Sequence, residues 1–246
     1  MAELAVHDLH KKLGQTDVLG GLSFRVGDGE FVSILGPSGS GKSTLFQLIG
    51  GLLEPDGGEI RLGEQPIRGR RGMISYMPQR PSLLPWRTVL DNVRLGAEIA
   101  GAPDPPDAID MLDKAGLGGY ADAYPHQLSG GMQQRAAFIR SLLSPQDFIC
   151  LDEPFSALDE FTRAEMQQWL LSLWEENPRS ILFVTHNIEE AIYLSDRILI
   201  LTDKPATLFA EYLVPFKRPR TPDLILSEEF LDIRRQIALQ LTAPHR

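Results

Sequence analysis

The amino-acid sequence predicts an α/β fold with a mainly parallel sheet, and three observations support this prediction. Apolar strand-like segments alternate with helical patterns in the C-terminal half of the chain. A glycine-rich turn joins an apolar strand to a helix near residue 40. The chain has 246 residues, of which 43% are hydrophobic, so it can bury one sizeable core. Strands that alternate with helices are typical of parallel sheets, because each crossover places a helix on a sheet face.

The first third of the chain contains short apolar segments that predict strands. Residues 31–35 are almost continuously apolar, as expected where both faces of a sheet are covered. A helix is expected to begin at Lys42, and residues 60–70 are expected to form a hairpin region. The strands predicted in this part are residues 3–9, 22–26, 31–35 and 72–77.

Residues 81–144 have a different pattern, which predicts a mostly helical insertion. Four apolar residues recur there at helical spacing, namely Met132, Ala136, Ile139 and Leu143. Residues 101–125 are interrupted by prolines and glycines, and we expect a looser stretch there. After the insertion, strands and helices alternate again. The predicted strands are residues 148–151, 181–184 and 198–201, and the predicted helices are residues 160–176 and 188–194.

The tail after Lys204 is less regular. Residues 216–222 (FKRPRTP) read as a basic, proline-containing turn, and residues 227–241 predict one amphipathic helix. Trp169 and Trp174 lie in the predicted helix 160–176, where we expect both to pack into the core.

Composition excludes several classes of protein. The sequence has no apolar stretch near the ~20 residues that a membrane-spanning helix needs. The first residues lack a cationic start followed by an apolar segment, so no secretory signal is expected. One cysteine, Cys150, fits a reducing compartment and reads as a small buried apolar residue. The net charge of −9 argues against nucleic acid as the main partner.

A phosphate-binding loop is predicted between residues 31–35 and the following helix. The segment GPSGSGKS matches G-x-x-x-x-G-K-S in the strand–loop–helix context that this motif requires. Glycines let backbone N–H groups surround phosphate oxygens, and the helix start adds partial positive charge. The lysine supplies a full charge, and the serine hydroxyl can ligate Mg²⁺. The alternative is a tight turn with an exposed lysine. The nucleotide-binding residues predicted here are Gly36, Pro37, Ser38, Gly39, Ser40, Gly41, Lys42, Ser43 and Thr44.

Two carboxylates end the apolar strand predicted at residues 148–151. Side chains at the carboxyl edge of a parallel sheet point into the crevice where ligands bind. Asp152 is therefore expected to hold Mg²⁺, directly or through water. Glu153 is expected to orient or deprotonate an attacking water. A solvated strand end is the alternative for this pair taken alone.

A third motif, LSGGMQQR at residues 128–135, resembles the signature of ABC-type ATPases. Ser129, Gly130 and Gly131 open a helix and so make a second phosphate-binding terminus. An ordinary serine N-cap accounts for Ser129 but not for the whole octet. In the resembling family, the signature of one subunit closes over the phosphate loop of the other. The resemblance therefore implies a homodimer that holds two ATP molecules at its interface.

The same resemblance implies a P-loop NTPase core with an N-terminal antiparallel β subdomain and a helical insertion. It implies one ABC ATPase domain over residues 1–246. The catalytic core would span about residues 1–80 and 145–205, the helical signature subdomain about 81–144, and a short C-terminal tail about 206–246.

Further motifs match this family in order. Gln79 resembles the glutamine that touches Mg²⁺ or the attacking water and links to a membrane subunit. Asp159, in SALD, resembles the aspartate of a loop that crosses the dimer interface. His186 resembles the switch histidine that contacts the γ-phosphate, and Glu153 then resembles the general base. One departure is Leu13, which stands where the family places an aromatic that stacks on adenine. Leucine offers no π-stacking, so we expect weak adenine selectivity and binding of GTP as well.

Two other stretches resemble a narrower group. Residues 83–93 and 216–220 are similar to ATP-binding subunits of importers for nitrate, alkanesulfonates, taurine or pyrimidine-type thiamine precursors. This resemblance implies a separate transmembrane permease, an extracytoplasmic solute-binding protein, and a peripheral place on the cytoplasmic side of the inner membrane. Trp86 either contacts the permease or packs under the helical insertion. Two other classes remain as alternatives: a non-transport ABC ATPase that acts on nucleic acid or ribosomes, and a P-loop kinase.

Overall fold

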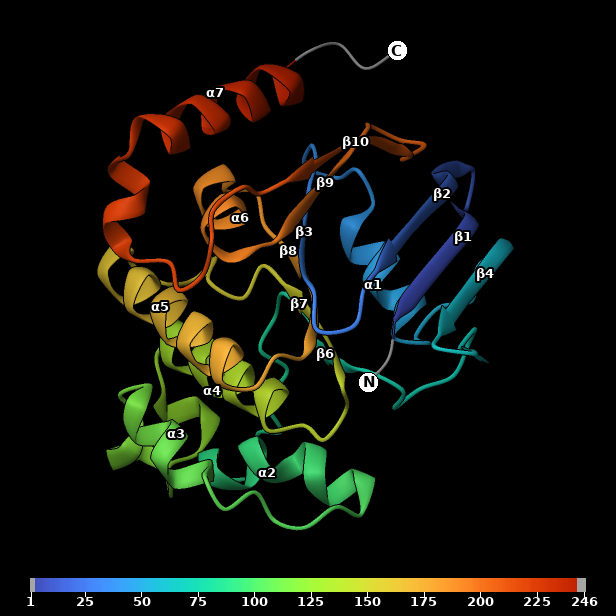
Figure 1. The fold of residues 1–246 in the computed structure, drawn as a ribbon. Helices are drawn as coiled ribbons and strands as arrows, with labels where there is room; N and C mark the ends of the chain where they lie inside the picture. Colours follow the sequence, from blue (N-terminus) through green and yellow to red (C-terminus); the bar gives the residue numbers. More distant parts are fainter. Residues whose placement is uncertain (1–2, 243–246) are drawn as a thin grey trace.

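The computed structural model describes residues 3–242, whose strands form two sheets (Figure 1). The larger sheet has the strand order β10-β9-β3-β8-β7-β6. Its neighbouring strands run parallel, except that β10 is antiparallel to β9. The mainly parallel α/β fold predicted from the sequence is confirmed. The bounds are β3 (Phe31–Leu35), β6 (Ser75–Met77), β7 (Phe148–Asp152), β8 (Ser180–Val184), β9 (Arg197–Leu201) and β10 (Leu208–Leu213).

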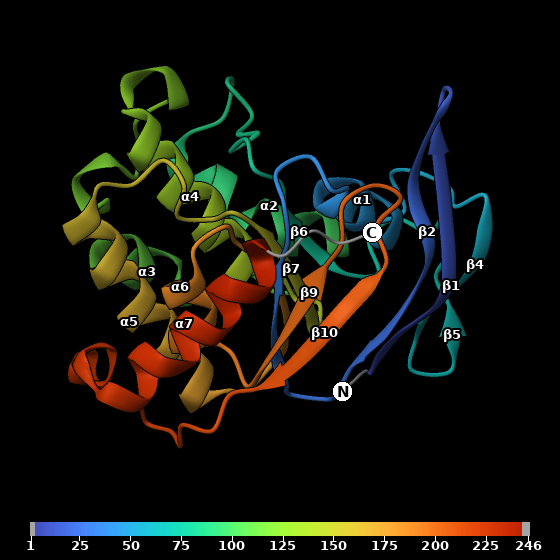
Figure 2. The ribbon, with the colours of Figure 1, turned by 90° about the horizontal axis from the view of Figure 1, so that it is seen from above.

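The smaller sheet is antiparallel and has the order β2-β1-β4-β5. Helix α1 (Lys42–Ile49) lies between the two sheets (Figure 2). Side chains such as Phe46 and Leu48 share one apolar core with both sheets, which fixes the start of α1 at the end of β3. The bounds are β1 (Leu4–Leu13), β2 (Thr16–Val26), β4 (Gly57–Leu62) and β5 (Gln65–Pro66).

Helices cover the other face of the larger sheet (Figures 1 and 2). Phe31, Phe138, Phe155 and Phe183 form the centre of this second core, with ring centroids 5.5–5.9 Å apart in neighbouring pairs. Every residue of β3, β7 and β8 is buried, which explains their continuous apolar runs. The helices here are α2 (Val89–Ala100), α3 (Ala108–Lys114), α4 (Gly130–Leu142), α5 (Glu160–Glu176) and α6 (Ile188–Leu194), with short 3-10 turns at η1 (Gly118–Tyr120) and η2 (Pro125–Gln127).

Several predicted elements are confirmed, and others are corrected. The strand predicted over residues 72–77 is shorter, because its pairing with β7 begins only at Ser75. Strand 31–35 and helices 160–176 and 188–194 have the predicted bounds. The stretch 101–125 is more ordered than predicted, because it contains α3 between its prolines and glycines. Strands β1 and β2 are longer than predicted, since the hairpin that joins them continues the antiparallel pairing to Leu13 and Thr16.

The tail contains a strand that the sequence pattern did not predict. Strand β10 is an edge strand with alternately half-buried and exposed residues, so its apolar signal is weak. It is followed by η3 (Pro222–Leu226) and helix α7 (Glu228–Thr242), which agrees with the predicted amphipathic helix. Trp174 is buried, and Trp169 packs on Phe138 with ring centroids 6.0 Å apart, which confirms the core placement of both.

Candidate functional site

The phosphate loop connects β3 to α1, as the sequence predicts. Its tip, Ser38 and Gly39, is exposed, whereas Ser40 is buried. Gly41 has a φ of 109°, and a Cβ added there would lie 2.7 Å from Val18 Cγ1. Only glycine fits this position without displacing strand β2. The loop therefore brings backbone and helix start to one point at the carboxyl edge of the sheet, where anions are favoured.

The Lys42 side chain is buried and lies back over this loop. Its Nζ donates hydrogen bonds to the carbonyl oxygens of Gly36 at 2.9 Å and Pro37 at 2.7 Å. Burial lowers the pKa of Lys42, and the carboxylates of Glu153 and Asp152 oppose this shift. The ammonium group is thus held between the loop and the two carboxylates. Thr44, the last residue of the predicted segment, lies half-buried in the first turn of α1.

Asp152 ends strand β7, and its side chain has the features of a metal ligand. The residue is 2% exposed, and its Oδ1 is buried without a hydrogen-bond partner among residues 3–242. Burial raises the pKa of Asp152, while a hydrogen bond from Ser43 opposes the shift. An unpaired buried carboxylate oxygen beside a hydroxyl suits Mg²⁺, which prefers hard oxygen ligands. In the part of the chain that the structure describes, no group of three or more His, Cys, Asp or Glu is placed to hold a metal ion by itself.

Glu153 adopts a left-handed backbone conformation, with a φ of 50°. Such a conformation costs a non-glycine residue about 1–3 kcal/mol and is found mostly where surrounding contacts enforce it. The Glu153 N–H donates to the Val184 carbonyl at 3.0 Å. Gln79 Nε2 donates to Glu153 Oε2 at 2.9 Å, and His186 Nδ1 lies 3.6 Å from the same oxygen. The structure thus brings together Gln79, Glu153 and His186, which lie far apart in sequence.

A buried carboxylate that the sequence analysis did not select lies behind His186. Glu190 accepts hydrogen bonds from Thr185 Oγ1 at 2.5 Å and from Gln167 Nε2 at 3.1 Å. Burial raises the pKa of Glu190. Thr185 Oγ1 in turn accepts from the Asn187 N–H at 3.0 Å, so this network fixes the backbone on both sides of His186. The sequence does offer a signal for Glu190. Two consecutive glutamates lie on a short helix that packs one side against the sheet, so one of the two is expected to be buried.

Gln134 is a second residue that the sequence analysis did not select. It is 1% exposed, and its Nε2 donates to the Glu153 carbonyl oxygen at 3.4 Å. It therefore links helix α4 to the backbone of Glu153. Gln134 lies off the apolar stripe of α4, and the buried polar position was not visible in the helical pattern.

The signature residues lie outside this cluster. Ser129 is the N-cap of α4, and its Oγ accepts from the Met132 N–H at 3.3 Å. A Cβ added to Gly130 would have no heavy atom within 4 Å, whereas one on Gly131 would lie 3.4 Å from Leu158. Asp159 is the N-cap of α5, and the hydrogen bonds from Thr162 lower its pKa. Within residues 3–242, no hydrogen bond or ion pair joins these four residues to the phosphate loop.

Known ATP-binding proteins are similar to this chain over most of its length. Residues 19–156 match the family model described as ABC transporter. A formylaminopyrimidine import ATP-binding protein (ThiZ) from Halalkalibacterium halodurans is 48% identical over 79% of this chain and 77% of its own length. An aliphatic sulfonates import ATP-binding protein (SsuB) from Granulibacter bethesdensis is 41% identical over 89% of this chain and 87% of its own. A dimeric, post-hydrolysis structure of the ATP-binding cassette MJ0796 with ADP and Pi matches with a TM-score of 0.76, at 32% identity, over 87% of this chain and 100% of that one.

The chain belongs to the ABC transporter family, and it is an ATP-binding ATPase of that family. The resemblance drawn from the three sequence motifs is confirmed. Of the helices within residues 3–242, none has both the length and the apolar character needed to cross a membrane.

Proposed function

We propose that this chain is the ATP-hydrolysing subunit of an importer for a small organic or anionic solute, and that it works as a homodimer beneath a separate permease. The observation that carries the proposal is the contact of Gln79 and His186 with the strained Glu153, beside the buried Lys42 and Asp152. The import direction rests on the relatives, which are named as import proteins for formylaminopyrimidine and aliphatic sulfonates.

The phosphate end of ATP is held by the loop at residues 36–43. The backbone N–H groups and Lys42 neutralise the phosphate oxygens. Ser43, Asp152 and Gln79 are the residues that would hold Mg²⁺. The bound ion would supply positive charge to the phosphate oxygens. The buried, unpartnered Oδ1 of Asp152 supports this assignment.

Glu153 acts as the general base in this proposal. It accepts a proton from water, whose oxygen attacks the γ-phosphorus, and ADP is the leaving group. Gln79 and His186 meet the same carboxylate oxygen, Oε2, and so orient it toward the water. Backbone strain at Glu153 supports this role, because strain of this kind is concentrated at functional sites.

A second copy of the chain completes each site. Ser129, Gly130, Gly131 and Asp159 have no hydrogen bond or ion pair to the phosphate loop within residues 3–242 of one copy. Helix α4 begins at Gly130 with an open approach, and an anion is favoured at such a terminus. We assign this terminus to the γ-phosphate bound by the partner subunit. The dimeric form of the MJ0796 cassette supports the arrangement.

The permease is expected to contact the surface beside Gln79 and helix α2. Trp86 is 71% exposed and Ile99 is 78% exposed, and exposed apolar side chains of this size suit an interface. Asn92 is fully buried and bonds the backbone of Leu84, Arg87 and Thr88, so the segment that carries Trp86 is held rigidly. This contact would place the chain at the cytoplasmic face of the inner membrane. An extracytoplasmic solute-binding protein would select the cargo.

The test is the variant Glu153→Gln, with Glu64→Gln as the matched control on an exposed turn of the smaller sheet. Loss of the base should lower ATP hydrolysis by about 10²–10⁴-fold and leave ATP binding intact. With ATP, the Glu153 variant should accumulate as a dimer in size-exclusion chromatography with light scattering. The control should behave as the wild type. Hydrolysis at the wild-type rate by Glu153→Gln would refute the assignment of the base.

A further inference from the structure

Helix α6 begins at Ile188, two residues after His186, so its position sets the position of that side chain. Asn187 is the N-cap of α6, and its Oδ1 accepts from the Glu189 and Glu190 N–H groups at 2.8 and 3.3 Å. The helix has seven residues. A helix this short has little stability of its own, so its orientation depends on what packs against it. Much of that packing comes from the part of the tail that follows β10, residues 214–242 (Figure 1).

Arg220 of the tail holds the C-terminal end of α6. Its Nη1 donates to the carbonyl oxygens of Ile192, Tyr193 and Ser195 at 3.0, 2.9 and 2.8 Å. Its Nε and Nη2 donate to the Phe216 carbonyl at 3.3 and 3.1 Å. The side chain is 1% exposed, and burial lowers the pKa of Arg220 to about 10. The guanidinium group therefore stays charged at neutral pH, and a cation is favoured beside the unpaired carbonyls of a helix end.

Arg218 binds the same end of α6. Its Nη2 donates to the Leu194 carbonyl at 2.7 Å, and its Nε donates to Asp196 Oδ1 at 2.9 Å. The guanidinium carbon lies 4.1 Å from the centroid of the Trp174 ring. The segment FKRPRTP was predicted as a basic turn. In the structure, its Arg218 and Arg220 side chains point into the molecule and bind the C-terminal end of α6.

The tail also reaches the N-terminal end of α6. Arg234 of helix α7 forms an ion pair with Glu189 of α6. Together with His186, Asn187 and Ile188, these two residues line an open depression of about 400 Å³. Between the two ends, Phe230 and Ile237 are fully buried in the core that contains Ala191 and Ile192, and Phe230 stacks on Phe216.

We propose that the tail positions His186 for ATP hydrolysis, with Arg220 fixing one end of α6 and Arg234 the other. The proposal rests on the function proposed above, which places His186 at the reacting phosphate. Within residues 3–242, neither arginine forms a hydrogen bond or ion pair with the phosphate loop or Glu153, so both are positioning residues. Loosening α6 lowers kcat because His186 leaves its productive geometry, while ATP binding at the phosphate loop is unaffected.

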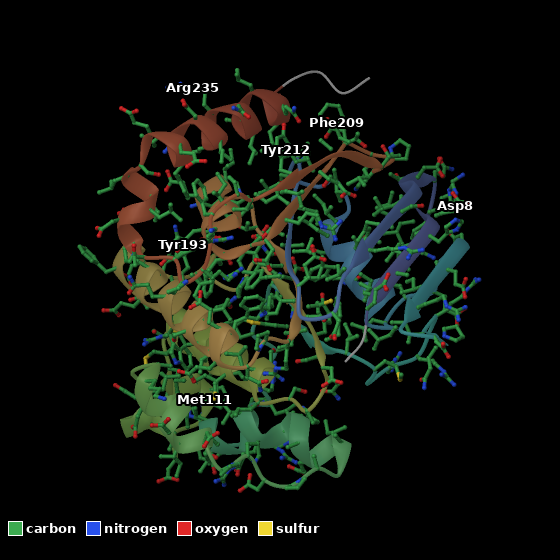
Figure 3. All side chains as sticks on the ribbon, in the orientation of Figure 1. Asp8, Met111, Tyr193, Phe209, Tyr212 and Arg235 are labelled. Atoms are coloured by element: carbon green, nitrogen blue, oxygen red, sulfur yellow. The ribbon has the colours of Figure 1, made fainter. Side chains whose placement is uncertain are left out.

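The test uses two neighbouring arginines of α7. Arg234 pairs across to α6, whereas Arg235 is 73% exposed and pairs with Asp232 of its own helix at 3.0 Å. Figure 3 labels Arg235 on α7, at the outer edge of the molecule. Arg234→Ala should lower kcat by about three- to tenfold. The KM for ATP and the melting temperature should stay unchanged, since an exposed ion pair contributes little to stability. Arg235→Ala should match the wild type in all three measurements.

A second variant, Arg220→Lys, keeps the charge but cannot reach three carbonyls at once. It should also lower kcat without raising the KM for ATP, provided that circular dichroism shows a native fold. If it does not fold, the comparison of Arg234 with Arg235 decides the question alone. Wild-type kcat in Arg234→Ala would overturn the proposal.

A double-mutant cycle with His186→Ala distinguishes positioning from a general structural effect. If Arg234 acts through His186, then adding Arg234→Ala to His186→Ala should cause no further loss of kcat. A further loss of the same factor would overturn the positioning role. Wild-type kcat in His186→Ala would overturn the proposed role of His186 and this inference together. Loss in His186→Ala with none in Arg234→Ala would overturn this inference alone.

Discussion

Two glycine-bearing segments precede helices in this chain, and they are built in opposite ways. The base of the phosphate loop is packed within its own subunit, because Gly41 lies against Val18 and the Lys42 side chain is buried near two carboxylates, while the loop tip at Ser38 and Gly39 is exposed. The signature segment is open, since Ser129 is exposed and Gly130 has free space where a side chain would lie. The first is a finished binding element. The signature segment is exposed, and we propose that its ligand is the γ-phosphate bound by another subunit.

Alanine substitutions at the two glycines give the largest expected contrast. Gly41→Ala forces a Cβ to 2.7 Å from Val18 at a positive φ, which costs about 1–3 kcal/mol. We expect a lower melting temperature and at least roughly tenfold weaker ATP binding, because the loop must move. Gly130→Ala should keep both properties, because nothing lies within 4 Å, but it should lower hydrolysis at least roughly tenfold.

Calorimetry, ATP titration and steady-state hydrolysis check this pair of variants. If both substitutions weakened ATP binding to one subunit equally, the contrast between a closed loop and an open signature would be wrong.

Asp152→Asn tests whether the buried, charged Asp152 carboxylate lowers the free energy of unfolding. Burial raises the folded-state pKa of Asp152, so the folded chain binds this proton more tightly than the unfolded chain. The free energy of unfolding therefore falls as pH rises through the two pKa values. Removing the charge should raise the melting temperature at pH 7 by about 2–4 °C for each ~1 kcal/mol relieved, measured without nucleotide or Mg²⁺.

The exposed Asp203→Asn is the control for this measurement and should leave the melting temperature unchanged. Asp152→Asn should also flatten the pH dependence of stability in acid. A lower melting temperature at pH 7 in that variant would show that Ser43 and Lys42 outweigh the cost of burying the Asp152 carboxylate, contrary to our expectation.

The smallest effect is expected at Leu13, which is 45% exposed at the end of β1. Leucine packs on a base without a stacking preference, so ATP and GTP should bind with similar affinity. Leu13→Tyr should strengthen nucleotide binding by about 0.5–1.5 kcal/mol, which is roughly two- to twelvefold in affinity. Competition binding with both nucleotides measures the ratio. A strong preference of the wild type for ATP would contradict this prediction, because a group other than Leu13 would then recognise the adenine base.

The sequence predicted the closed half of the site better than the arrangement around His186. The phosphate loop and Asp152–Glu153 follow apolar strands, and parallel strands bring such ends to one edge. Glu190, Gln134 and Arg220 were not selected, because each is a polar residue buried by tertiary packing off the apolar pattern. Strand β10 was not predicted for the related reason that an edge strand needs few apolar residues.

The helices could likewise be predicted only in part from the sequence. Helices 160–176 and 188–194 have the predicted bounds, and in the structure Asp159 and Asn187 are their N-caps. Helix α3 was hidden among prolines because its seven residues are too short to establish a period.

The central claim is that each nucleotide site is shared between two copies of the chain. The most direct test is the rate of ATP hydrolysis per subunit as a function of protein concentration, with the oligomeric state followed by light scattering. If the sites are shared, the rate per subunit should rise with concentration as dimers form, and then level off. A constant rate per subunit at concentrations where the protein is monomeric would contradict it.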